Sequence, residues 1–322
     1  KSPNKKILDF LNKLKTKSEV FIIPNKENIG FVASVNKGLS SSPISDVILL
    51  NSDTEVFGDW VDRIFRAYKN NDDIGTITPM SNNATICSYP NFPNGSELPN
   101  NFNAELIDSL CKKHNEGNIY EVPTGVGSCM FISRESITKV GYLDSKLFGK
   151  GYGEENDLCL RLKAKGFRNV LLTDTYIYHS GGASFKEKKD LLCQKALDKI
   201  TTHYPDYKKF VSDFITNDLF RADRLKIDIL TLKSSKKPIV LCITNNRGGG
   251  TLKHIKEKTK ELKNVQTRLL LTINPNDRKT FKIFYLPNMI RITLPLNDAQ
   301  LMKFIKEINI SHIEVHQILD FQ

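Results

Sequence analysis

Three carboxylates crowd into four positions of the stretch GYGEENDLCLRLKAKG, residues 151–166: Glu154, Glu155 and Asp157. Neighbouring carboxylates repel each other, so a chain selected only for stability rarely bunches them. Acids in the first turn of a helix meet the positive end of the helix dipole, which stabilises each by about 0.3–1 kcal/mol. A carboxylate held at a site, with its pKa set by burial and by neighbours, instead acts as a general base. Both interpretations stay open for this stretch.

Helix capping explains these acids unequally. Asp157 and Arg161 are four residues apart, a spacing that permits an ion pair along one helix face. Glu154 and Glu155 are adjacent, so their side chains leave the helix in different directions, and capping explains them less well. The adjacent pair is therefore the candidate for chemistry.

Two more groups with metal-binding chemistry stand where predicted strands end. The segment DVILLNSD, residues 46–53, is an apolar strand that runs into Asn51, Ser52 and Asp53. A divalent ion such as Mg²⁺ or Mn²⁺ at Asp53 would bridge that carboxylate to a diphosphate, although Asn, Ser and Asp also favour ordinary turns. His179 follows a strand rich in Tyr and Ile, where an imidazole is either structural or a third metal ligand.

The hydrophobic pattern predicts the elements that position these groups. In chain order it indicates a helix at 7–15, a strand at 20–24, a turn and helix at 28–42, a strand at 46–53, a helix at 60–70 and a strand at 74–80. Alternating strands and helices at this spacing are typical of a parallel sheet with crossover helices. Ligands of such sheets lie beyond the carboxyl ends of the strands, which is where Asn51 and Asp53 fall.

The pattern continues through the rest of the chain. It indicates an irregular segment at 81–120 with a helix near 103–114, a strand and helix at 127–144, a helix at 153–167 ended by Gly166, a strand pair at 169–180 and basic helices from 186 to 232. KSSKKP, residues 233–238, is a polar linker, and a new strand, glycine-rich loop and helix follow at 238–262. We therefore divide the chain into residues 1–185, a helical extension and linker at 186–236, and a second unit at 237–322.

Composition narrows the class of protein. With 322 residues, 39% of them hydrophobic and 26% charged, the sequence is that of a soluble globular protein of about two domains. Its apolar runs are too short to span a bilayer, and no charged and apolar leader opens it, so we expect a cytoplasmic protein. The six cysteines form no CxxC pair, which argues against a zinc cluster or a disulfide framework and fits a reducing compartment.

The net charge of +11 favours polyanionic partners. No interleaving of aromatic and basic residues supports a nucleic acid, so we expect none. The excess of Lys instead favours peripheral contact with an anionic inner membrane surface.

Five segments, taken in order, are more specific than any of them alone: NKENIGFVASVNKG, LLNSDTEVFGDW, PTGVGSCMFISRESITKVGYLD, GYGEENDLCLRLKAKGF and YIYHSGG. Together they resemble the family 2 glycosyltransferases of the GT-A fold, and most of all the rhamnosyltransferase-like branch used in bacterial surface polysaccharide synthesis. The resemblance covers about residues 5–185. It implies a Rossmann-like mixed sheet with flanking helices.

The resemblance also implies an activity. Members of the family transfer a hexosyl or deoxyhexosyl group, with inversion, from a nucleotide-sugar to a glycan or lipid-linked acceptor, with Mg²⁺ or Mn²⁺ as cofactor. By position, Glu155 would be the base that deprotonates the acceptor hydroxyl, with Glu154 beside it, and Asp53 and His179 would bind the metal. Asp157 would hold the start of the catalytic helix together with Arg161. The expected substrate-binding positions are Asn28, Gly30, Asn36, Asn51, Thr124, Gly125 and Arg161.

The sequence departs from the family pattern at three places. Asn51 stands where the family has the first Asp of its metal-binding DxD, and Glu155 stands where an Asp is more usual. The helix at 7–15 corresponds to the one that follows the family's second strand, so the two opening strands that hold the nucleobase and ribose lie outside this chain. We accordingly expect weak nucleotide binding. A catalytically degenerate domain that binds a glycan or a partner is the alternative function.

The second unit has its own glycine-rich segment, NNRGGGTLKHI, residues 245–255. It lacks GK[ST] and does not fit GxGxxG, so it is either a tight turn or a set of backbone amides, at Gly248 to Gly250, that hold a phosphate. This unit resembles the amino-terminal half of GT-B glycosyltransferases, family 4-like, in which His316 would approach the active cleft. We expect a partial Rossmann-like α/β domain.

Overall fold

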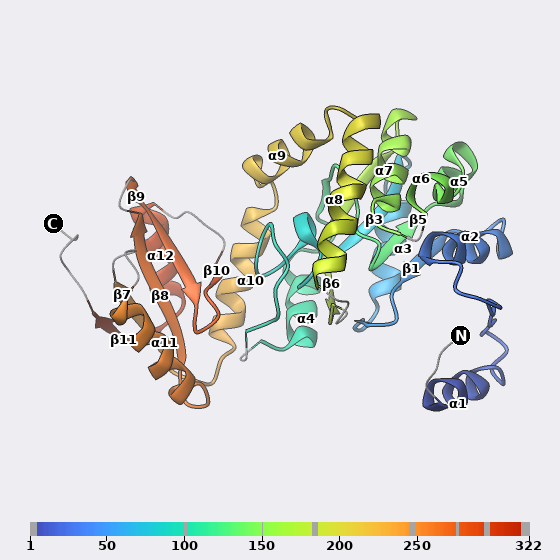
Figure 1. The fold of residues 1–322 in the computed structure, drawn as a ribbon. Coiled ribbons are helices and arrows are strands. Elements are labelled where there is room, and N and C mark those ends of the chain that lie inside the picture. Colours follow the sequence, from blue (N-terminus) through green and yellow to red (C-terminus); the bar gives the residue numbers. More distant parts are fainter. Residues whose placement is uncertain are drawn as a thin grey trace.

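The computed structural model describes residues 5–99, 102–149, 151–181, 186–244, 249–274, 277–292 and 297–316. Two α/β units, each with a mixed sheet and flanking helices, lie on either side of a long connecting helix (Figure 1). The expected α/β class with mixed sheets is confirmed.

The first sheet has the strand order β1–β5–β3–β6–β2, with β4 also paired to β6. Its strands are β1 (Val47–Leu50), β2 (Thr54–Glu55), β3 (Ile74–Ser81), β4 (Ile119–Glu121), β5 (Cys129–Ile132) and β6 (Arg168–His179). β5 lies between β1 and β3 and is antiparallel to both, so a purely parallel sheet is the wrong expectation here. All four residues of β5 are buried, as expected for a strand with a neighbour on each side.

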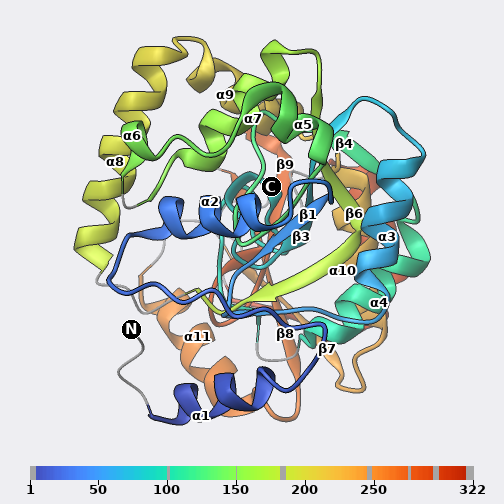
Figure 2. The same ribbon diagram turned by 90° about the vertical axis from the view of Figure 1, so that its right-hand side faces the viewer.

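Helices cover both faces of this sheet: α2 (Phe31–Ser41), α3 (Trp60–Lys69), α4 (Ala104–His114), α5 (Arg134–Val140), the short α6 (Ser145–Phe148) and α7 (Glu154–Ala164). Side chains alternate along β5, so Met130 and Ile132 pack with α2, α5 and α7 while Phe131 packs with α3. In the view of Figure 2, α3 and α4 lie to one side of the central strands and α6 and α8 to the other. A single-turn 3₁₀ helix, η1, spans Thr85–Cys87.

Two predicted strands differ from the structure. The segment at 20–24 follows α1 (Lys5–Leu14) but joins no ladder among the described residues, and the side chain of Phe21 is 86% exposed. An apolar run becomes a strand only where a neighbouring strand accepts its hydrogen bonds, and none lies beside this one. The predicted strand pair at 169–180 is the single strand β6, whose register against β3 shifts between the pairs Pro79–Leu172 and Met80–Tyr176. The bulge accommodates buried Asp174, whose carboxylate accepts a hydrogen bond from the Gly117 amide.

Three helices follow β6: α8 (Lys186–His203), α9 (Tyr207–Asn217) and α10 (Arg221–Lys233). α10 belongs to two hydrophobic cores, because Ile227 packs in the first unit and Leu232 in the second. Between them, buried Asp228 accepts hydrogen bonds from the hydroxyls of Tyr89 (3.0 Å) and Tyr285 (3.4 Å), one from each unit. The connecting helix therefore fixes the two units to each other.

The second sheet has the order β10–β9–β8–β7–β11. Its elements are β7 (Ile239–Thr244), α11 (Gly250–Leu262), β8 (Thr267–Asn274), β9 (Asp277–Tyr285), β10 (Ile290–Arg291), α12 (Asp298–Glu307) and β11 (Ile310–Val315). β7 runs parallel to β8 and β11, with α11 on one face and α12 with α10 on the other, which is the layered half of a Rossmann-like fold. Gly248, one of the glycines singled out from the sequence, lies outside the described residues. In the described ranges no helix has both the length and the apolar character needed to cross a membrane.

The dual packing of α10 gives a test of the fold. Leu232 is 2% exposed in the second core, so Leu232→Ala should lower the free energy of unfolding by about 2–5 kcal/mol through lost burial and a cavity. Leu219→Ala is the matched control, because Leu219 is 57% exposed and should change stability by about 0.5 kcal/mol or less. Urea unfolding followed by circular dichroism measures both. Equal effects of the two substitutions would contradict the packing of α10.

Candidate functional site

A pocket of about 380 Å³ in the first unit brings the sequence motifs together. It lies beyond the carboxyl end of β1, beside the end of β6 and at the start of α7. Its walls come from five separate segments: Phe31, Asn51, Val126 to Ser128, Gly151 to Glu155 without Gly153, and His179. Both the acidic pair and the strand-end histidine therefore face one hollow.

Strand pairing places Asp53 beside His179. Thr54 of β2 pairs with His179 of β6, and the amide of Ser180 donates to the Asp53 carbonyl at 3.1 Å. The Asp53 Oδ2 atom then lies 3.4 Å from the His179 Nε2 atom. Two residues far apart in sequence become neighbours because one backbone ladder joins them.

The hydrogen bonds around His179 fix the state of its ring. Its Nδ1 lies 3.2 Å from the carbonyl oxygen of Asn83, and a carbonyl only accepts, so Nδ1 carries the hydrogen. Neutral His179 therefore turns the lone pair of Nε2 toward the carboxylate of Asp53. The two atoms are close enough to serve as two ligands of one cation. Metal-binding histidines commonly have this arrangement, with the other ring nitrogen bound to a carbonyl.

Hydrogen bonds to the backbone hold the segments around His179 and Asn51 in place. The side chain of Asn82 makes two hydrogen bonds to the backbone of His179. Its Oδ1 accepts from the His179 nitrogen at 2.7 Å, and its Nδ2 donates to the His179 carbonyl oxygen at 3.0 Å. The amide of Asn51 donates to the Ser128 carbonyl at 2.9 Å, while the Asn51 side chain lines the pocket. The side chain of Asn51 therefore lines the same pocket as His179.

The acidic pair lies at the first turn of α7, on the other wall of the pocket. Gly153 precedes it with φ 91°, and a Cβ there would lie 2.8 Å from the Phe148 ring and 3.1 Å from Ala196. Only glycine therefore allows α7 to begin this close to α6 and α8. Glu154 is 5% exposed and Glu155 is half-buried.

Burial overrides the helix dipole at these two acids. Burial and the neighbouring Glu155 raise the pKa of Glu154 to about 7, and burial also raises the pKa of Glu155. The Oε2 atom of Glu154 is buried without a hydrogen-bond partner among the described residues. Backbone hydrogen bonds lower the pKa of both acids, but burial outweighs them. A carboxylate whose pKa is raised is suited to taking up a proton.

Asp157 and Arg161 act on the helix rather than in the pocket. Arg161 Nε donates to Asp157 Oδ2 at 2.7 Å, and the Arg161 guanidinium also donates to the carbonyls of Val140 (2.7 Å) and Tyr142 (3.0 Å). Tyr204, the residue after α8, donates to the other Asp157 oxygen at 2.8 Å. These bonds tie the start of α7 to its neighbours, and neither Asp157 nor Arg161 lines the pocket.

Three of the expected substrate-binding positions, near the start of the chain, likewise hold the backbone and do not line the pocket. The Asn36 amide bonds both to the nitrogen (3.1 Å) and to the oxygen (2.8 Å) of Leu143, so it joins α2 to the segment before α6. Exposed Asn28 accepts from the amide of Gly30 at 3.0 Å, and Gly30 has φ 83°. That turn starts α2 and brings Phe31 to the pocket wall.

Thr124 and Gly125 shape the wall behind the acidic pair. Buried Thr124 accepts from the Asn156 amide of α7 at 3.2 Å. A Cβ on Gly125 would lie 2.5 Å from Thr78 Oγ1 and 2.7 Å from Met130 Cε, so this position requires glycine. Both support the pocket without lining it.

Sequence reasoning missed several lining residues, of which Tyr152 and Phe31 are the aromatic ones. Tyr152 has φ 74°, a left-handed conformation that a bulky residue seldom adopts. In the sequence, the stretch GYG, an aromatic residue between two glycines, could have indicated Tyr152 as a pocket residue.

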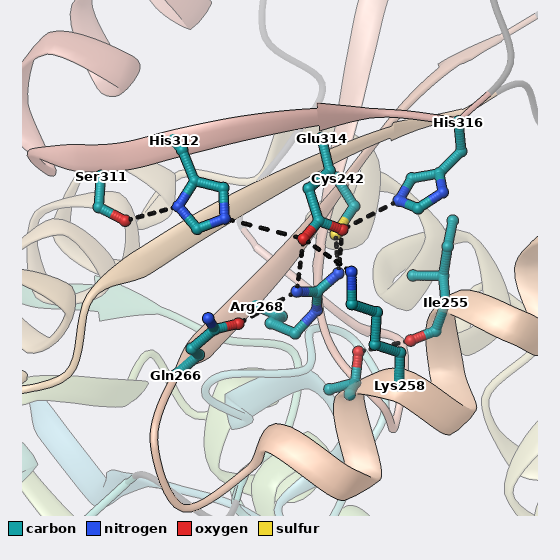
Figure 3. Close-up of polar contacts among 10 residues, drawn as sticks. Cys242, Ile255, Lys258, Gln266, Arg268, Ser311, His312, Glu314 and His316 are labelled. Carbon is teal, nitrogen blue, oxygen red and sulfur yellow. Dashed lines mark hydrogen bonds and ion pairs between the residues drawn. The ribbon is translucent and has the colours of Figure 1, made fainter.

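A second cluster, in the second unit, has ligand atoms close enough for a metal. Among the described residues Cys242, Glu314 and His316 form the one such group of His, Cys, Asp and Glu, with ligand atoms within 4.8 Å of one another (Figure 3). Arg268 forms a two-pronged ion pair with Glu314 and donates to Cys242 Sγ at 3.1 Å, while Lys258 lies 3.1 Å from Glu314.

Permanent cations already occupy that second cluster. Arg268 and Lys258 lower the pKa of Glu314 to about 2, and burial raises the pKa of the Cys242 thiol to about 11. A metal ion would have to displace Arg268, which is fully buried. The cluster, including the sequence candidate His316, is better explained as an ion-pair network across β8, β7 and β11.

Comparison with known proteins finds similarity only among solved structures. No protein-family model matches the chain, and no curated protein matches it. Among solved structures the chain is similar to a crystal structure of GalNAc-T7 with UDP, GalNAc and Mn²⁺, with a TM-score of 0.42 and 16% sequence identity. The match covers 64% of this chain and 40% of that one, so this chain spans less than half of that protein's length. The function proposed below rests on the pocket.

The raised pKa of Glu154 makes stability depend on pH. Its pKa is about 7 in the folded protein and near 4.5 when unfolded, so the folded state holds the proton more tightly and stability falls as pH rises from 4.5 to 7. Glu154→Gln should therefore be more stable than the wild type by roughly 2 kcal/mol at pH 8 and about equal to it at pH 4.5. Urea unfolding at both pH values measures the difference.

Glu135→Gln is the control for this substitution, because Glu135 is exposed on α5 and should show no pH-dependent difference. A Glu154→Gln protein that is less stable than the wild type at pH 8 would show that the buried carboxylate is stabilised by a partner.

Proposed function

We propose that this chain is a glycosyltransferase of GT-A type that moves a sugar, with inversion, from a nucleotide-sugar to a hydroxyl acceptor. The observation that supports the proposal is one pocket lined both by His179, whose ring lies 3.4 Å from the Asp53 carboxylate, and by the acidic pair Glu154 and Glu155. Transfer of this kind needs a group that neutralises a departing diphosphate and a base that takes the acceptor proton.

The metal-facing wall fits Mg²⁺ or Mn²⁺. Asp53 and His179 would hold the ion, with Asn51 as a further oxygen donor, and two ligands of one octahedral ion lie about 3 Å apart, close to the 3.4 Å between Oδ2 and Nε2. The mixture of carboxylate, amide oxygen and imidazole suits Mn²⁺ in particular. A bound divalent ion would neutralise negative charge on the diphosphate leaving group.

The acidic wall supplies the base. Glu155 would accept the proton of the acceptor hydroxyl as its oxygen attacks the anomeric carbon from the face opposite the diphosphate. Glu154, buried beside it, raises the proton affinity of the pair. Asp157 and Arg161 hold the first turn of α7, so both carboxylates are positioned before substrate arrives.

The biological setting is part of the same proposal. The acceptor would be a glycan or lipid-linked sugar of a bacterial cell-envelope polysaccharide, reached from the cytoplasmic side with the lysine-rich surface near anionic lipid. The units would be residues 1–185, 186–236 and 237–322, with the transferase site in the first. Asn51, which removes one charge from the metal-facing wall, favours a second candidate, a glycan-binding or partner-binding module without catalysis.

The base assignment is tested by Glu155→Gln. We expect the rate of sugar transfer to fall by about 10²–10⁴-fold, because the isosteric amide cannot take up a proton. Transfer from a panel of nucleotide-sugars to methyl glycosides measures it, with thermal unfolding as the check on folding. The control Glu135→Gln should transfer at the wild-type rate, whereas a Glu155→Gln enzyme as fast as the wild type would refute the base assignment.

The metal assignment is tested by binding alone. The wild type should bind Mn²⁺ in titrations followed by electron paramagnetic resonance, and Asp53→Asn or His179→Ala should weaken binding by about tenfold or more, since each removes one ligand. Asp62→Asn, an exposed acid on α3, is the control and should bind as the wild type does. Unchanged Mn²⁺ affinity in both site variants would place the ion elsewhere.

A further inference from the structure

The loop Gly151–Tyr152–Gly153, beside the acidic pair, has an unusual backbone conformation, and the proposed function gives it no role. All three residues have positive φ, at 136°, 74° and 91°. Glycine adopts such values without cost, but in Tyr152 the Cβ crowds the following carbonyl, so the backbone is strained there. A glycine or asparagine at this position would relieve the strain.

Packing within the protein does not offset that strain. Tyr152 is partly exposed and belongs to none of the buried hydrophobic clusters. Its hydroxyl makes no hydrogen bond to any residue in the part of the chain that the structure describes. Strained bulky residues that contribute little to the core are concentrated at binding sites, where the strained geometry serves the ligand.

Tyr152 lines the pocket beside the acidic pair, two residues before Glu154. Phe31 lines the same region and lies against the loop, since a Cβ on Gly151 would be 3.5 Å from the Phe31 Cβ. Two aromatic side chains from separate segments thus line the pocket together with the carboxylates and His179, and Asp53 lies beside the His179 ring. A sugar ring has the matching chemistry: C–H groups that pack on an aromatic face and hydroxyls that reach a carboxylate.

We propose that Tyr152 is the acceptor-binding residue, whose ring packs on the apolar face of the pyranose that presents its hydroxyl to the acidic pair. The proposal rests on the glycosyltransferase function above and names the acceptor class: an uncharged sugar ring, since a second carboxylate beside Glu154 and Glu155 would be repelled. Tyr152 touches substrate only through its ring, so the hydroxyl is dispensable.

The test compares Tyr152→Asn with Tyr152→Phe. Asn tolerates the left-handed conformation, so Tyr152→Asn should raise the midpoint of thermal unfolding by about 2–4 °C, while the KM for the acceptor rises roughly tenfold. The KM for the donor should stay within about twofold. Tyr152→Phe keeps the ring and should retain the acceptor KM, and Tyr142→Asn, an exposed tyrosine outside the pocket, should change neither KM.

The outcomes separate this proposal from the general function. A wild-type protein that transfers no sugar to any acceptor refutes the proposed function. Transfer by the wild type with an unchanged acceptor KM in Tyr152→Asn refutes the role of Tyr152 alone, and a rise confined to the donor KM would assign the ring to the nucleotide instead. Saturation-transfer NMR with methyl pyranosides gives a readout independent of turnover: signal in the wild type that is lost in Tyr152→Asn supports the proposal, and signal retained in that variant overturns it.

Discussion

The site depends on one contact, the approach of Asp53 Oδ2 to His179 Nε2 at 3.4 Å. Because Nδ1 is committed to the Asn83 carbonyl, the two facing atoms both carry lone pairs unless the ring is protonated. This edge of the pocket therefore offers two groups that can share one cation. The β2–β6 ladder and the hydrogen bonds of Asn82 to the His179 backbone hold the two groups together, so their proximity is a property of the fold.

The opposite wall has the complementary property. α7 begins at Gly153 so close to its neighbours that Glu154 and Glu155 are drawn out of water, and their ionisation becomes unfavourable. A helix dipole alone would have lowered their pKa values. The ion pair of Asp157 with Arg161, extended to Tyr204, keeps the helix in that position despite the repulsion at its first turn.

The second unit shows how the same residue types give a different result. Glu314 has a histidine and a cysteine beside it, yet Arg268 and Lys258 satisfy its charge, and its pKa is lowered rather than raised. Among the described residues, the buried Oε2 atom of Glu154 has no hydrogen-bond partner. The difference between a closed structural network and an open site lies in whether the charge is already balanced by the chain.

The sequence by itself determined most local elements and the chemistry available: the helices at 60–70 and 103–114, the strand at 74–80, and the acidic pair at a helix start all follow from periodicity and residue type. Only the tertiary structure decided which of these meet. In the structure, antiparallel β5 lies between β1 and β3, and the segment at 20–24 pairs with no strand among the described residues. Asp53 lies beside His179 because β2 pairs with β6, which is distant in sequence. Such pairings, and the left-handed backbone at Tyr152, depend on what surrounds a residue in space, which spacing along one chain does not record.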